Sequence, residues 1–420
     1  MKILIYEDSK WVNLTPLSLL KCVFELRCGF FSVFEKMLAI LPGAEKGLWV
    51  RDYLKELAKK KYGISVNDES FFDDDILLIN GRWIMTDEEK IFLEEEKTVK
   101  SGKDIIYALL KKETASNLWH GNFEEFLQSV SSNIYEQQKE AILIEYPWHF
   151  IRHNPKILTS DFKHAGKQGI KGDFSSKATI VGDEKDVFIS EKTRVHPFVV
   201  IDTQTGPVYI DEGAQVFPFT RIEGPCYIGK NTDIMPGANI REGCSFGEVC
   251  KIGGEVEESI FHSYTNKYHD GFIGHSYIGE FVNLGALTTN SDLKNDYSNV
   301  SVYLNGKPVD TGELKVGSFI GDHTKTSIGT LLNTGTVVGI MGNITAENIL
   351  PKYFPSFMWY VNGKFMKGYG LEMMLATAKS VMARRKRQLM PEEESVIRYV
   401  YEMTAFERKE SIQKSRKQKQ

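Results

Sequence analysis

Hydrophobic side chains recur at every sixth position through the middle of this 420-residue chain. A period of six fits neither the α-helix, at about 3.6, nor the strand, at about 2, and it is typical of the coils of a parallel β-helix. Glycine and other small residues occupy intervening positions, where they let the chain turn the corners of a coil. The pattern predicts a left-handed parallel β-helix with these side chains inside it: Ile210, Val216, Ile222, Ile228, Ile234, Ile240, Phe246 and Ile252.

The six-residue register shifts twice along this segment. It resumes from Phe272 to Leu284 and again from Leu314 to Ile344. The intervening residues 258–271 and 290–313 are expected to form loops that leave the β-helix. We assign the β-helix domain to residues 171–350.

Residues 1–160 carry a different pattern, in which short apolar strands alternate with amphipathic helices. KILIY (2–6) and DILLING (75–81) predict strands. Alternation of strands and helices favours an α/β sheet, and we assign these residues to an α/β domain. Helices are expected at 48–63, 103–112 and 123–143.

The segments on either side of the β-helix differ from it in composition. YPWHFIRHNPKILTSDF (146–162) contains two prolines and is expected to be a linker. Residues 351–420 predict a helical extension, in which PEEESVIRYVYEM (391–403) begins with proline and acids, as helix N-termini often do. The basic end, 408–420, is expected to be a frayed tail.

Charge and composition exclude several classes of protein. Lysine plus arginine amount to 52 against 56 acidic residues, for a net charge of −4, so no basic field favours nucleic acid. The sequence contains no apolar run of about 18 residues, so no membrane span is predicted. Five cysteines without a CxxC pair favour a reducing compartment. We expect a cytoplasmic protein.

An α/β domain followed by a hexapeptide β-helix resembles the GlmU-like bifunctional sugar nucleotidyltransferase/acyltransferases. The stretch NLTPLSLLKCVFELRCGFFSVFEK, from Asn13 to Lys36, is similar to the signature of a subgroup with a shortened N-terminal domain. The resemblance implies nucleotidyl transfer from a nucleoside triphosphate to a sugar phosphate, with Mg²⁺, in the first domain. It implies acetyl transfer from acetyl-CoA to a sugar amine in the β-helix, and a homotrimer.

In the first domain the resemblance implies a triphosphate cradle within LRCGFFSVFEK. Arg27, Gly29 and Lys36 would supply it, since phosphate binding needs cations and accessible backbone N–H groups. The alternative is that Arg27 and Lys36 are ordinary cations flanking a helix. In LLINGRW, Asn80 stands where the family has a metal-binding Asp, and Asn80 and Arg82 are candidate substrate contacts.

The β-helix contains the second candidate site. Laid without gaps on the family pattern H-x-x-Y-x-G-x-x-x-x-G-x-x-V-N-I-G-A-G-T, the chain reads HDGFIGHSYIGEFVNLGALT. The resemblance implies that His269 is the general base, a role that suits the imidazole pKa near about 6.5, with His275 as the fallback. It implies sugar or acetyl-CoA contacts for Arg241, Asn283, Gly285, Ala286 and Thr288.

Three positions depart from the family in a way that changes the charge of this site. Glu257 stands where the family has a phosphate-binding Lys, Asn239 replaces one of two Arg residues, and Asp292 replaces an Asn. Fewer cations and an added acid disfavour a phosphorylated acceptor. Lys267 and Lys294 are the nearby cations that would compensate.

Two alternatives remain beside the bifunctional enzyme. His262, His269 and His275 raise the question of zinc, but their spacings of seven and six differ from the pair five apart in gamma-class carbonic anhydrases, and we predict no metal. The other alternative is a non-catalytic trimeric β-helix scaffold with a degenerate nucleotide-binding domain. Asn80, Glu257 and Asp292 favour it.

Overall fold

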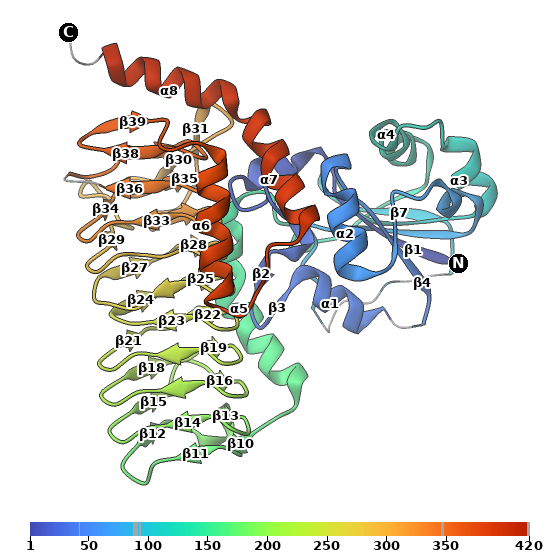
Figure 1. Ribbon diagram of the computed structural model, residues 1–420. Coiled ribbons are helices and arrows are strands. Elements are labelled where there is room, and N and C mark those ends of the chain that lie inside the picture. The colour runs from blue at the N-terminus through green and yellow to red at the C-terminus, as the bar shows by residue number, and fades with distance from the viewer. Residues whose placement is uncertain (42, 87–90, 92–93, 346–347, 418–420) are drawn as a thin grey trace. The chain divides into compact units, whose positions relative to one another are not determined.

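The computed structural model describes residues 1–41, 43–86, 91, 94–345 and 348–417 (Figure 1). These residues form two compact units. The first unit ends at Tyr146, fourteen residues before the predicted boundary, and the C-terminal helices belong to the same unit as the β-helix. The first unit comprises Met1–Leu14, Leu20–Leu26 and Phe31–Tyr146, and the second Thr15–Leu19, Arg27–Phe30 and Pro147–Gln420.

The first unit is built on a seven-stranded sheet in the order β5-β4-β1-β6-β8-β7-β9. β1 pairs in parallel with β4 and β6, so the carboxyl ends of these three strands meet at one edge. The predicted α/β class is therefore confirmed. The strands are β1 (Lys2–Tyr6), β4 (Glu45–Trp49), β5 (Ser65–Val66), β6 (Ile76–Asn80), β7 (Lys97–Ser101), β8 (Asp104–Leu110) and β9 (Glu136–Gln138). The α-helices are α1 (Val33–Ile40), α2 (Lys55–Tyr62), α3 (Lys112–Leu118) and α4 (Phe123–Asn133).

Several helix predictions in this unit were wrong in extent or type. The helix expected at 103–112 is strand β8, whose apolar run is buried between β6 and β7, where packing decides the conformation. The helix expected at 48–63 begins only at Lys55, because β4 occupies the preceding residues up to Trp49. The helix expected at 123–143 ends at Asn133.

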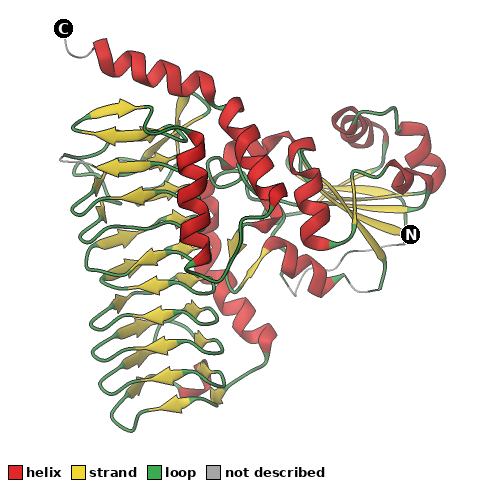
Figure 2. Ribbon diagram, viewed as in Figure 1, coloured by secondary structure: helices red, strands yellow, loops and turns green. Residues whose placement is uncertain are grey.

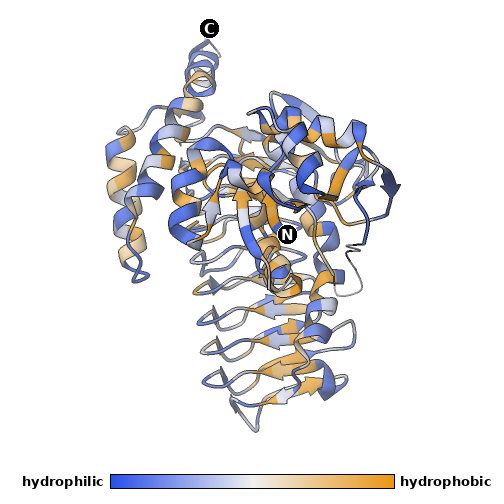
Figure 3. Cartoon of the chain, turned by 90° about the vertical axis from the view of Figure 1, so that its right-hand side faces the viewer, coloured by the Kyte–Doolittle hydropathy of each residue, from blue (hydrophilic) through white to orange (hydrophobic). Residues whose placement is uncertain are grey.

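The second unit contains the β-helix, in which short parallel strands form three stacked walls (Figures 1 and 2). One wall has ten strands, and Ile210, Ile228 and Phe246 occupy equivalent positions on three successive strands of it. All three side chains are fully buried, as the six-residue period predicts. In Figure 3 the coil strands carry hydrophobic segments, and the corners between them are more hydrophilic.

The first register shift is a change in coil length and not a loop. Phe246 pairs with Phe261, fifteen residues further on, whereas Ile228 pairs with Phe246 after eighteen. The coil continues through β25 (Ile260–Phe261), β26 (Asn266–Lys267) and β27 (Phe272–Gly274), so the expectation of a loop at 258–271 was wrong.

The second register shift is an excursion from the coils, as predicted. After β29 (Thr289–Asn290) the chain forms an antiparallel hairpin of β30 (Ser301–Leu304) and β31 (Lys307–Asp310). It rejoins the ten-stranded wall at β32 (Ser318–Ile320).

Helices cover parts of the β-helix. The segment expected to be a linker is helix α5 (Pro147–Ala165), which begins at a proline and accommodates Pro155 inside it. Its side chains share a small buried cluster with Phe30, Tyr209 and Tyr227. The C-terminal helices are α6 (Leu371–Ala383), α7 (Pro391–Met403) and α8 (Ala405–Lys417), so most of the expected frayed tail is helical. Within the described residues, none of the helices has the length and apolar character that a membrane span requires.

Candidate functional site

A histidine and an aspartate meet at one corner of the β-helix. His275 follows β27 in the left-handed region, at φ 48°, and its side chain is buried. Its Nδ1 lies 2.8 Å from Oδ2 of Asp292. Burial by itself would raise the pKa of Asp292, but the hydrogen bond with His275 and the charge of that imidazole hold this pKa below its ordinary value. The carboxylate of Asp292 thus fixes the orientation of the His275 imidazole through Nδ1.

Two glutamates lie on the other side of the imidazole. Nε2 of His275 is 3.6 Å from Oε2 of Glu258, too far for a direct hydrogen bond. Burial raises the pKa of Glu258 above its ordinary value, although the charge of His275 opposes this. Glu257 instead pairs with Nη1 of Arg241 at 2.9 Å and with Nζ of Lys315 at 3.2 Å. Glu258 is therefore the carboxylate that faces the imidazole.

His275 and Glu258 border a cavity of about 590 Å³ in the second unit. Helix α5, the coil corner and the chain returning from the β30–β31 hairpin supply its walls. Its cations are Arg152 and Lys315, each paired with a glutamate, Glu313 and Glu257 respectively. The lining residues are Trp148, Ile151, Arg152, Glu258, His275, Leu293, Tyr297, Gly312, Glu313, Leu314, Lys315 and Val316. The cavity thus combines a half-buried acid, Glu258, and a buried base, His275, with two cations.

His269, the histidine to which the family pattern assigns the base, lies elsewhere. It is exposed on the corner between β26 and β27, where its ring meets the edge of the Tyr268 ring. Its carbonyl accepts a hydrogen bond from Nζ of Lys267 at 3.0 Å, and that lysine also donates to Gly253. Lys294 donates to the Asn299 carbonyl at 2.6 Å. The two lysines expected to compensate for missing cations thus hold the backbone.

The other residues carried over from the family in the β-helix contact neighbouring coils. Asn283 Oδ1 accepts from the Asn266 side chain at 2.8 Å. The Gly285 N–H donates to Thr326 Oγ1, and Thr288 shares a hydrogen bond with the same hydroxyl. The Ala286 carbonyl accepts from the Gly329 N–H. These contacts give the residues a structural role in coil stacking, and their part in acetyl-CoA binding stays a prediction.

In the first unit, Asn80 and Arg82 lie at the carboxyl edge of the parallel strands. Arg82 is fully buried and makes three hydrogen bonds to Asp8, the shortest at 2.5 Å, and one to Asp104. The Asn80 amide donates to Asp8 at 3.1 Å and to the Ile105 carbonyl at 2.9 Å. Both predicted substrate contacts are therefore engaged by neighbours at this edge.

The remaining members of the predicted cradle fall in different units. Gly29, in the second unit, has φ 71°, and a Cβ there would lie 2.2 Å from Asp161 Oδ2. Its N–H donates to Asn154, and the Arg27 N–H donates to the Tyr277 hydroxyl. Lys36, in the first unit, is a buried residue of α1 near the Phe31 ring. Close packing explains Gly29, and the cradle stays a prediction.

Sequence reasoning missed Asp8, Asp104 and Glu258. Tyr6 and Asn80 are partners on the adjacent parallel strands β1 and β6. Asp8 lies two residues after Tyr6 and Arg82 two residues after Asn80, so the parallel register could have predicted that they are neighbours. Glu258, His275 and Asp292 are each separated by seventeen residues, which is one coil at this part of the β-helix. A search at coil spacing would have found this column.

The three histidines do not form a common metal site in the part of the chain that the structure describes. His262 pairs with Glu280 at 3.0 Å. The three-residue group whose ligand atoms lie within 4.8 Å of one another is instead Glu257, Glu258 and His275. Because Arg241 and Lys315 already neutralise Glu257, this group does not fit a metal cation well.

Comparison with known proteins supplies relatives for both parts of the chain. Residues 3–168 match the family model of the sugar nucleotidyl transferases. A bifunctional sugar-1-phosphate nucleotidylyltransferase/acetyltransferase of Sulfurisphaera tokodaii is 38% identical over 141 residues, 33% of this chain and 35% of that protein. A bifunctional protein GlmU of Methanocaldococcus jannaschii is 28% identical over 294 residues, 64% of this chain and 71% of its own.

Among solved structures, the UDP-N-acetylglucosamine acyltransferase of Francisella novicida matches 56% of this chain and 78% of its own, at 18% identity and a TM-score of 0.22. The assignment of the β-helix therefore rests on the chain's own strand register. The chain spans about a third of the length of the first curated relatives that it matches. Residues 3–168 are thus similar to the sugar nucleotidyl transferases, and about two thirds of the chain is similar to a bifunctional GlmU protein.

Proposed function

We propose that this chain is a sugar-phosphate nucleotidyltransferase-like protein whose β-helix transfers an acyl group from acyl-CoA, with acetyl-CoA as the expected donor, to a sugar amine. The observation that carries the proposal is that His275, whose Nδ1 is paired with Asp292, lines the 590 Å³ cavity. The relatives named as acetyltransferases support the same chemistry. His275 replaces His269 as the leading candidate for the base.

The pair can act as a general base and its positioning group. With Nδ1 held by Asp292, Nε2 is left to accept the proton of the attacking amine as the amine nitrogen bonds to the thioester carbonyl. The carbon–sulfur bond then breaks, and CoA leaves as the thiol after taking up a proton. Asp292 stabilises the imidazolium that forms. Such proton transfer contributes about 10²–10⁴-fold to a rate.

The charges in the cavity favour an acceptor that carries both an amine and an anion. An amine nitrogen that lies to one side of Nε2 of His275 and Oε2 of Glu258 can reach hydrogen-bond distance of both, since these atoms are 3.6 Å apart. Arg152 and Lys315 line the same cavity, and a phosphate there would share them with their partners Glu313 and Glu257. We therefore propose an amino sugar phosphate as the acceptor class.

For the first domain we propose binding of a nucleoside triphosphate or sugar phosphate at the carboxyl edge of β1 and β6. The carboxylates there, Asp8 and Asp104, are of the type that Mg²⁺ prefers. Arg82 contacts both oxygens of Asp8, and Arg82 and Lys10 share Oδ2 of Asp104. This arrangement does not fit a magnesium site, and we propose no step through the ion.

The same Arg82 contacts favour the second candidate, in which the first domain has lost catalysis and the β-helix is a trimeric scaffold. Calorimetric titration of the full chain separates the two. The enzyme proposal expects acetyl-CoA to bind, and expects CoA release when amino sugar phosphates are added. Absence of acetyl-CoA binding together with absence of turnover would reject it, whatever the nucleotide titration gives.

We further propose a cytoplasmic homotrimer. Phe198 and Phe219 are stacked 5.4 Å apart on one corner of the coils and are 51% and 71% exposed, so they offer an apolar strip to a second copy. Sedimentation equilibrium should give three times the mass of 47.8 kDa. The five cysteines are buried thiols outside any disulfide, as a reducing compartment favours.

A further inference from the structure

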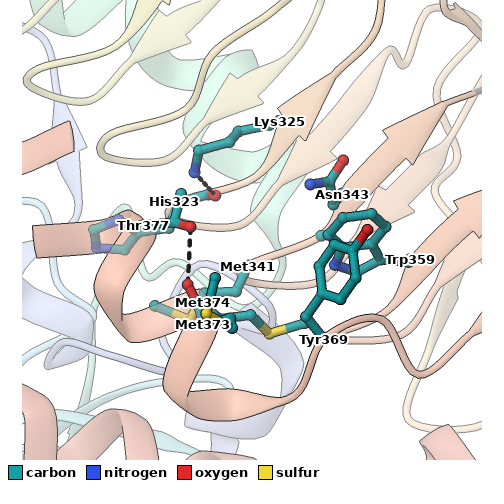
Figure 4. A pocket seen from close by; sticks show the side chains of 10 residues that line it. His323, Lys325, Met341, Asn343, Trp359, Tyr369, Met373, Met374 and Thr377 are labelled. Carbon is teal, nitrogen blue, oxygen red and sulfur yellow. Dashed lines mark hydrogen bonds between the residues drawn. The ribbon is translucent and has the colours of Figure 1, made fainter. Parts of the chain in front are cut away.

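A second cavity lies between the β-helix and helix α6 (Figure 4), and its lining does not include Glu258, His275 or Asp292. It has a volume of about 270 Å³. Trp359 of strand β38 (Trp359–Val361) and Tyr369 form one wall, with ring centroids 4.8 Å apart, and Met373 and Met374 of α6 contribute thioethers. The cavity is therefore mainly apolar and has aromatic walls.

One charged side chain enters this cavity. Lys325 begins strand β33 (Lys325–Thr326) and stands in a column of outward-facing residues, between Asn283 and Asn343. Its Nζ donates to the His323 carbonyl at 2.8 Å. Among the described residues that line the cavity, none is an aspartate or glutamate. The Lys325 ammonium can therefore donate further hydrogen bonds, and no carboxylate of the described cavity lining pairs with it.

The burial of this lysine is energetically unfavourable. Burial lowers the pKa of Lys325 to about 8, and no charged side chain among the described residues offsets that effect. The other titratable side chains that line the cavity are His323 and Tyr369, neither of which supplies a negative charge near neutral pH. An anion brought in by a ligand would compensate the ammonium.

We propose that this cavity binds a small organic anion, in which an apolar or aromatic body lies against Trp359 and Met373 and a single carboxylate or phosphate accepts hydrogen bonds from Lys325. The volume suits a ligand of roughly the size of a substituted benzene ring. Neither His275 nor Glu258 lines this cavity, so the inference does not rest on the proposed base.

Calorimetric titration of the full chain tests the proposal with benzoate, phenyl phosphate and the neutral benzyl alcohol. We expect benzoate or phenyl phosphate to bind with a dissociation constant on the order of 0.1–1 mM at pH 7, and benzyl alcohol to bind at least tenfold more weakly. Whichever of benzoate and phenyl phosphate binds more tightly identifies the carboxylate or the phosphate as the natural head group. Affinity should fall as the pH rises through about 8, because the ammonium then loses its proton.

The variant Lys325→Met should lose ten- to a hundredfold in affinity. Its matched control is Lys251→Met, which changes a lysine of the same outward column that pairs with Asp233 at 3.4 Å and does not line the cavity. The control should bind like the original chain. Absence of binding by both acids, equal losses in the two variants, or equal affinity for benzyl alcohol would each overturn the proposal. A melting temperature measured for both variants separates loss of binding from loss of folding.

Discussion

Nδ1 of His275 lies 2.8 Å from Oδ2 of Asp292, a residue seventeen positions later in the sequence and one coil further along the β-helix. The contact joins two corners that the sequence separates, and it fixes which ring nitrogen is left for a substrate. Glu258 stands one coil earlier at the same corner. The three side chains form a column across three successive coils, and its members can be tested one at a time.

Replacing the imidazole should remove the base. His275→Ala is expected to lower the rate of acyl transfer by about 10²–10⁴-fold, because no other described group replaces its Nε2 beside Glu258. Acetyl-CoA affinity, measured by calorimetry, should change less than about threefold. His269→Ala is the matched control and should leave the rate nearly unchanged, since that ring is exposed at a coil corner. A larger loss from His269→Ala would return the role to the residue that the family pattern indicates.

If His275 is the base, as proposed, Asp292 acts through it, and loss of Asp292 should affect kcat more than KM. In Asp292→Asn, an amide replaces the acceptor at Nδ1 and favours the wrong tautomer of the imidazole. We expect kcat to fall by about 10–1000-fold, with the KM of the acceptor within threefold of its original value. Nitrogen NMR of His275 should show the proton moving from Nδ1 to Nε2. A merely structural role would change the melting temperature and leave the tautomer unaltered.

Glu258 should select for an amine. Glu258→Gln removes the carboxylate that faces Nε2 of His275, so the KM for amino sugars should rise about tenfold or more. Hydroxyl sugars that serve as poor acceptors should be unaffected. Burial raises the pKa of Glu258 above 4.5, so the KM for amines in the original chain should fall as the pH rises through that elevated value and the carboxylate ionises. Glu313→Gln, at another wall of the cavity, serves as the comparison.

The β-helix was predictable because its period directly marks the inward positions. Ile210, Ile228 and Phe246 are one coil apart in sequence and are paired in the structure. The period failed where coil length changed, since the coil from Phe246 to Phe261 is shorter. Strand β8 was missed because a continuous apolar run has no period, and only its position between two strands decides its conformation.

The candidate site was harder to predict, because it depends on tertiary contacts. The gapless family pattern assigned the base to His269, which the fold leaves exposed, whereas His275 six residues later is buried against Asp292. The sequence marked Asp292 as a departure from the family. Its partner, His275, lies one seventeen-residue coil earlier, and that coil length was not known from the sequence. Arg82 was expected to face substrate, and it is buried against Asp8.

A buried amide joins the segment around Gly29 to the β-helix and α5, and its loss should destabilise the second unit. Asn154 Oδ1 accepts from the Gly29 N–H at 2.7 Å and from the Ser245 hydroxyl at 3.1 Å, and its amide donates to the Gly243 carbonyl at 2.8 Å. Asn154→Ala leaves these buried groups unpaired, at a cost of about 2–4 kcal/mol in the free energy of unfolding. Denaturant unfolding measures this. Lys163→Ala, at an exposed position of the same helix, should change it by less than about 0.5 kcal/mol.

Lys325 should make the stability of the chain depend on pH in the alkaline range. Burial lowers its pKa from 10.5 to about 8 in the folded state, so folding disfavours the ammonium. Below about pH 8 the side chain is charged in both the folded and unfolded states, and the full penalty applies. As the pH rises from about 8 to 10.5, the folded chain holds the neutral amine while the unfolded chain still binds the proton, and the penalty disappears. In Lys325→Met the penalty is absent at every pH.

The variant should therefore be more stable than the original chain by roughly 2–3 kcal/mol at pH 7, and the difference should shrink to near zero above about pH 10.5. Denaturant unfolding at pH 7, 9 and 10.5 measures it, with Lys251→Met as the comparison, because that lysine is paired with Asp233 and partly exposed. A constant difference across the three pH values would mean that the methionine acts through packing alone. A binding role for Lys325 would explain why the chain keeps a cation that lowers its stability.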